Sequence, residues 1–84
     1  MKSFSTILST ISQLNSEYTL VRDFNIAKKL FHESMSKLNP ILVKENSVIV
    51  RAYRKDRGNV KYLTIKISLS KDVNGKPLLT VEYL

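Results

Sequence analysis

The chain of 84 residues contains no cysteine and no tryptophan, and it has only two glycines and two prolines. The lack of cysteine excludes disulfide bonds and cysteine-ligated metal sites, and it favours a reducing cytoplasm as the setting. Two isolated glycines cannot form a glycine-rich phosphate loop. No apolar run approaches the roughly 20 residues that span a bilayer. We therefore expect a cytoplasmic protein with no membrane segment and no cofactor.

Residues that support catalysis or metal binding are also scarce. The only histidine is His32, and a lone histidine has neither a second metal ligand nor a nucleophile to activate. The seven acidic residues are scattered, and no pair recurs at the spacing of metal ligands or of an acid/base pair. We therefore expect no metal site and no enzyme, and a minimal ribonuclease is only the third alternative for function.

The first half of the chain has the apolar periodicity of two helices. Apolar residues from Phe4 to Leu14 recur at intervals of three and four, with Ser3 placed as an N-cap and Asn15–Ser16 as the end. A second apolar stripe runs from Leu20 to Leu38, with Asp23 as the cap of a late start. Asn39–Pro40 ends this helix, because the residue before a proline avoids the α region.

The second half alternates between apolar and polar residues, as strands do. The pattern covers residues 48–55, 60–69 and 79–83, and a short extra strand is indicated at 41–44. Between the first two runs, residues 56–59 form a turn that sets Lys55 opposite Val60. Counting back from this pair places apolar residues together on one face. The resulting pairs are Ala52 with Leu63, Val50 with Ile65, and Val48 with Ile67.

The second turn, at residues 72–76, tests this register. A plain two-residue Asn74–Gly75 turn would set Ile67 opposite Glu82, which an apolar face does not tolerate. A type I turn followed by Gly75 in a left-handed bulge shifts the register by one residue. The expected pairs are then Leu69 with Leu79, Ile67 with Val81, Ile65 with Tyr83, Lys66 with Glu82, and Ser68 with Thr80.

These patterns predict an α+β fold of the order α-α-β-β-β in one domain, residues 1–84. Two N-terminal helices would pack on one face of an antiparallel meander of three or four strands. We expect the core to contain both helical and strand residues. They are Phe4, Ile11, Phe24, Ala27, Phe31, Val48, Val50, Leu63, Ile65, Ile67 and Val81.

The clearest functional feature is a basic segment at the first hairpin. Residues 51–61 hold five basic side chains and one acid, which is +4 of the net charge of +7. Charges at a hairpin end discourage edge association, but five in eleven residues exceeds that need. The predicted contacts to an anionic partner are Arg51, Arg54, Lys55, Arg57 and Lys61.

Two tyrosines extend this candidate site. The register sets Tyr53 opposite Tyr62 on the sheet face away from the helices. Such a pair can simply stabilise the sheet, and it can also stack on unpaired bases. The sequence thus favours a non-enzymatic protein that binds RNA or DNA with low specificity. The alternative is an adaptor or inhibitor that docks on an acidic protein through the sheet face or an edge strand.

Overall fold

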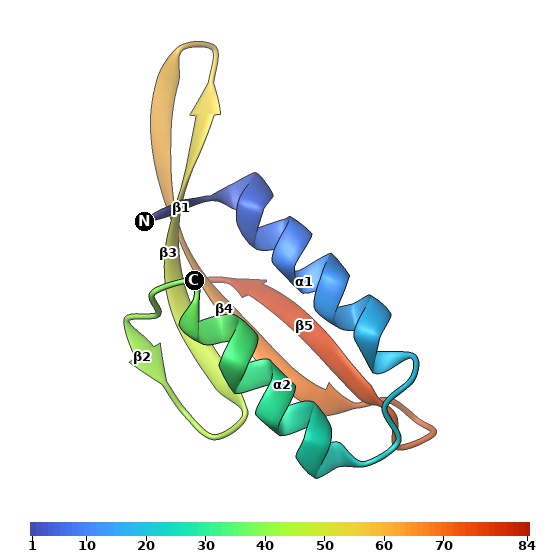
Figure 1. Ribbon diagram of the computed structural model, residues 1–84. Helices are drawn as coiled ribbons and strands as arrows, with labels where there is room; N and C mark the ends of the chain where they lie inside the picture. The colour runs from blue at the N-terminus through green and yellow to red at the C-terminus, as the bar shows by residue number, and fades with distance from the viewer.

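The computed structural model describes all residues from Met1 to Leu84. Two helices, α1 (Phe4–Tyr18) and α2 (Phe24–Ser36), lie on one face of a five-stranded sheet. The strands are β1 (Lys2–Ser3), β2 (Leu42–Val43), β3 (Ser47–Asp56), β4 (Asn59–Lys71) and β5 (Pro77–Tyr83). The opposite face of the sheet carries no helix (Figure 1). The α+β prediction, with two helices followed by a β3-β4-β5 meander, is confirmed.

Helix α1 begins where the sequence predicts and ends later. The Ser3 hydroxyl accepts a hydrogen bond from the Thr6 N–H at 3.2 Å, which satisfies one free donor of the first turn. Asn15–Ser16 does not end the helix, which continues to Tyr18. Tyr18 is buried, and its hydroxyl donates to the Ala27 carbonyl of α2 at 3.0 Å. The extra turn therefore ties the two helices together.

Helix α2 has the late start that Asp23 allows. Its carboxylate accepts from the Asn25 N–H at 2.9 Å. Leu20, which the sequence placed on the second stripe, lies in the loop before this helix and is 86% exposed. The chain leaves the helix through Asn39, whose positive φ of 52° precedes Pro40. Neither helix is long and apolar enough to cross a membrane.

The two predicted hairpin registers are confirmed. Val48, Val50 and Ala52 of β3 lie opposite Ile67, Ile65 and Leu63 of β4. In the second hairpin, Ile67 lies opposite Val81 and Lys66 lies opposite Glu82. Gly75 has a φ of 78°, as the bulged turn requires. Lys66 and Glu82 are neighbours but form no ion pair. The two salt bridges of the protein join Lys28 to Glu45 and Lys61 to Asp56.

The sheet is mixed, because β1 adds a parallel pairing that the sequence did not predict. Lys2 and Ser3 pair in parallel with Ala52 and Tyr53 of β3. The short strand expected near residues 41–44 is present as β2, which pairs with Val48 and Ile49 of β3. The strand order is β1-β3-β4-β5, with β2 beside β3. Thus β3 is flanked on one edge by two short strands.

The core lies between the helices and the covered face of the sheet. Seven of the predicted core residues are buried, and Phe4, Phe24 and Leu63 are partly buried against them. Val81 is an exception, since it is 38% exposed, and its neighbour Tyr83 is 64% exposed. Both belong to β5, which has a strand neighbour on one side only. The sequence pattern identified their face correctly but overstated their burial.

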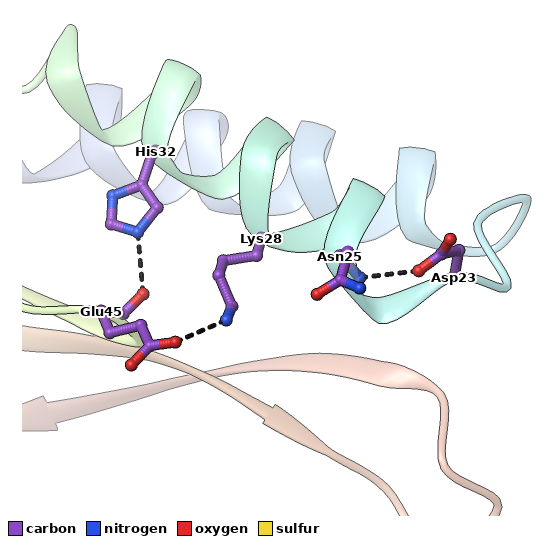
Figure 2. A network of polar contacts seen from close by, with 5 residues as sticks. All are labelled: Asp23, Asn25, Lys28, His32 and Glu45. Carbon is purple, nitrogen blue, oxygen red and sulfur yellow. Dashed lines mark hydrogen bonds and ion pairs between the residues drawn. The ribbon is translucent and has the colours of Figure 1, made fainter.

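Polar contacts fasten α2 to the turn between β2 and β3. The Lys28 ammonium donates to the Glu45 carboxylate at 2.7 Å, and this hydrogen bond holds the pKa of Glu45 below its ordinary value. His32 Nε2 lies 2.8 Å from the Glu45 carbonyl oxygen. Figure 2 shows both side chains reaching down from the helix to the same residue. His32 thus helps to link α2 to the turn before β3.

Candidate nucleic-acid interface

The β3–β4 hairpin projects beyond the rest of the fold. The pairing of β1 with β3 ends at Tyr53, and the last bond from the β5 side joins the Leu84 N–H to the Thr64 carbonyl at 3.0 Å. Residues 54–63 therefore form a two-stranded arm with no third strand on either edge. Figure 1 shows this arm extending past the helices. It contributes to an elongated molecule of 43 × 22 × 21 Å.

The arm ends in a tight turn. Asp56 pairs with Asn59, so only Arg57 and Gly58 form the loop. Both have positive φ angles, 50° and 82°. This is the backbone of a type I′ turn, whose twist matches that of paired strands. The turn presents Arg57 at the extreme end of the molecule, in a conformation that a residue with a Cβ atom adopts less readily than glycine.

The five predicted basic residues are all exposed, but the hairpin divides them between its two faces and its turn. Strand alternation places Arg51 and Lys55 on the face that carries no helix, here called the outer face. It places Arg54 and Lys61 on the other face, directly opposite each other. Arg57 belongs to the turn. The structure therefore does not bring all five together as one patch.

The charges on the helix side of the arm are partly balanced. Lys61 Nζ lies 3.5 Å from a carboxylate oxygen of Asp56, and both side chains are largely exposed. An exposed pair at this distance contributes little stability. It does offset some of the repulsion between Arg54 and Lys61, since like charges directly opposite destabilise a sheet. Arg51, Arg54, Lys55 and Arg57 form no ion pair within the protein.

The outer face brings Tyr53 and Tyr62 together with two of the bases. The tyrosines are cross-strand partners, as predicted, and they lie between Arg51 and Lys55. Tyr62 is 63% exposed, whereas Tyr53 is partly buried. The aromatic ring pairs of the protein are Phe4 with Tyr83 and Phe31 with His32, so the two tyrosine rings do not stack on each other. Neither tyrosine ring is paired with another aromatic ring of the protein.

Lys66 is an outer-face base that the sequence-based site omitted. It follows Tyr62 and Thr64 along β4 at the alternation that defines this face. Its strand neighbours are Ile49 and Glu82. The predicted register already set Lys66 on the outer face, but its pairing with Glu82 favoured a structural role. Since no ion pair forms, the outer face carries Arg51, Lys55 and Lys66 around the tyrosines.

A hollow of about 380 Å³ lies where the arm leaves the body. It is lined by residues 3–5, Leu8 and residues 53–55. The first turn of α1, which forms one wall, contains no acidic residue. Arg54 and Lys55 lie on the opposite wall, so the positive charge of the arm extends to its base.

The rest of the molecule contains no cluster of side chains that forms a second candidate site. No three histidine or acidic side chains come together as a metal site. Every buried side-chain nitrogen or oxygen atom has a hydrogen-bond partner. No protein-family model, curated protein or solved structure matches this chain. The assignment of function therefore depends on the charge, exposure and geometry of the arm.

Proposed function

We propose that this protein is a small non-enzymatic nucleic-acid-binding protein that contacts phosphates through the 51–62 hairpin. One observation carries the proposal: the β3–β4 hairpin presents five exposed basic side chains and two tyrosines, and four of these bases lie on its uncovered arm, residues 54–63. The proposed contact residues are those expected from the sequence, with Lys66 added. They are Arg51, Tyr53, Arg54, Lys55, Arg57, Lys61, Tyr62 and Lys66.

The electrostatics of the arm favour a polyanion. Arg54 and Lys61 lie opposite each other, and only Asp56 offsets their repulsion. Phosphates between or beside these side chains would relieve it. Because Lys and Arg contacts to phosphate carry no sequence information, binding through them has low sequence specificity. Release of condensed counterions then makes the affinity fall steeply with salt.

The tyrosines give the outer face a preference for unpaired bases. A base can stack on an exposed tyrosine ring only where it is not already stacked in a duplex. Each such stack contributes ~1–3 kcal/mol. Arg51 and Lys55 flank the tyrosines at a position suited to the phosphates on either side of a stacked base. We therefore expect single strands to bind more tightly than duplexes of the same length.

A salt titration with matched variants tests the proposal. Affinity for a generic oligonucleotide is measured by fluorescence anisotropy between about 50 and 200 mM salt. Changing Arg54, Lys55 and Arg57 together to Gln removes three positive charges from the arm. The control changes Lys29, Lys37 and Lys44 to Gln, which removes the same charge from exposed positions elsewhere. Each lost phosphate contact reduces the slope of log affinity against log salt by ~0.7–0.9.

The arm variant should therefore flatten the salt dependence by about two units, and the control should leave it nearly unchanged. Tyr62→Leu should weaken single strands about 5- to 150-fold and affect duplex binding much less. Equal effects of the arm and control variants would mean that net charge, not the arm, drives binding. If the wild type has no measurable affinity in low salt, docking on an acidic protein becomes the leading alternative.

A further inference from the structure

Strand β5 leaves one edge of the sheet unpaired. Its only strand neighbour is β4. The Leu84 N–H donates to the Thr64 carbonyl of the β4 side. By the alternation of an antiparallel ladder, the backbone groups of Leu79, Val81 and Tyr83 then face away from β4. These free N–H and C=O groups can pair with a further strand.

Beyond Pro77, its first residue, β5 lacks the usual protection against pairing. Natural edge strands are commonly interrupted by lysine, proline or a bulge. Between residues 78 and 84 there is no proline, and the only charge is that of Glu82. The strand is instead rich in exposed apolar side chains. They are Leu78, Val81, Tyr83 and Leu84.

We propose that β5 pairs in antiparallel fashion with β5 of a second copy of this chain, with Val81 on the twofold axis. This register sets Leu79 opposite Tyr83 of the partner subunit and Leu78 opposite Leu84 of the partner subunit. It joins the two sheets through about six backbone hydrogen bonds. A twofold axis makes the interface self-complementary, since every pair occurs twice. The exposed apolar residues of the edge then cover one another.

The neighbouring registers are less favourable, which makes the proposed pairing specific. Moving the axis to Thr80 sets Pro77 opposite Tyr83 of the partner subunit, and proline has no N–H to donate. Moving it to Glu82 sets that carboxylate opposite its own copy, and like charges directly opposite are destabilising. With Val81 on the axis, Glu82 lies opposite Thr80 of the partner subunit. Thus charge and proline position both favour one arrangement.

The charge of the whole chain is compatible with this dimer. Each copy carries +7, of which the arm, residues 54–63, holds +3. Since β5 runs towards the arm and the pairing is antiparallel, the two arms extend in opposite directions from the axis. Their repulsion is therefore weak at physiological ionic strength, where screening acts over ~8 Å. An acidic partner has no such match, because the only charge on this edge is that of Glu82.

Two lysine substitutions on adjacent residues test the proposal. Val81→Lys would set two ammonium groups opposite each other at the axis. Thr80→Lys adds the same charge but sets it opposite Glu82 of the partner subunit. Both side chains are exposed, so both variants should retain the β4–β5 ladder. Circular dichroism and amide chemical shifts of each monomer establish that they do.

Sedimentation velocity across a concentration series measures the outcome. We expect a reversible wild-type dimer, weakened more than about tenfold by Val81→Lys and retained by Thr80→Lys. A wild-type protein that stays monomeric up to about 1 mM would overturn the proposal. A dimer that both variants weaken equally, or that neither affects, would also overturn it, because the contact would then lie elsewhere.

Discussion

Replacing Tyr18 with Phe should change how stability depends on pH. The Tyr18 hydroxyl lies in the core and donates to the Ala27 carbonyl at 3.0 Å. Its removal should lower the free energy of unfolding at neutral pH by ~1 kcal/mol, the usual net value of one hydrogen bond. The ring itself remains, so no cavity of appreciable size forms.

The alkaline behaviour follows from the raised pKa of Tyr18. Burial raises this pKa, and the neighbouring Glu17 carboxylate adds to the effect. Above about pH 10, the unfolded chain therefore loses a proton that the folded protein keeps. Stability that is complete below pH 10 then falls by up to ~1.4 kcal/mol per pH unit. Tyr18→Phe has no hydroxyl proton to lose at this position, so its stability lacks this decline. The falling stability of the wild type should therefore meet that of Tyr18→Phe near pH ~11.

Urea denaturation followed by circular dichroism, at pH values from about 7 to 11.5, measures both effects. Tyr62→Phe is the matched control, since it removes a hydroxyl from an exposed ring that makes no hydrogen bond in the protein. Its stability should stay within about 0.5 kcal/mol of the wild type at neutral pH. Parallel curves for the wild type and Tyr18→Phe above pH 10 would refute the reasoning, because they would show that Tyr18 ionises without unfolding the core.

Two further substitutions test the core and the second turn. Ile65 is fully buried in the central strand β4, so Ile65→Ala should lower the free energy of unfolding by ~2–5 kcal/mol. Val73→Ala, at an exposed loop position, should be nearly neutral, and equal urea midpoints for the two variants would contradict the assignment of the core. Gly75 has a φ of 78°, so Gly75→Val should destabilise the protein by ~1–3 kcal/mol and Gly75→Asn by less, because asparagine tolerates the left-handed region. A lower melting temperature for Gly75→Asn than for Gly75→Val would argue against the bulge.

The registers of both hairpins could be predicted because two independent constraints agree. Alternation identifies the face of each strand, and the glycine turns fix how the strands are aligned. A slip of one residue would bury Glu82, so a single solution remained. The same logic set Tyr53 opposite Tyr62 and assigned Lys66 to the outer face. Much of the candidate site was therefore available from the sequence.

Other features depend on tertiary packing that no local pattern records. Alternation shows which way Val81 points, but it does not show that β5 is an edge strand and that Val81 stays 38% exposed. Tyr18 follows two polar residues typical of a helix end, so its burial against α2 gives no local signal. The five bases lie within eleven residues of the sequence, but strand geometry separates Arg54 and Lys61 from Arg51 and Lys55. This division, by contrast, was already implied by the predicted register, because alternation sets Arg51 and Lys55 on one face and Arg54 and Lys61 on the other.

The parallel pairing of β1 has a consequence for how the protein opens. Lys2 and Ser3 pair with Ala52 and Tyr53, about fifty residues away in the chain. Closing a loop of that length costs ~3.5 kcal/mol of chain entropy, more than two residues of ladder can supply. The contact therefore depends on α1, which begins directly after it and packs on the sheet. Transient detachment of this terminal strand would uncover the β3 edge at Ala52 and Tyr53, so that the free part of the hairpin lengthens at its base while its tip stays unchanged.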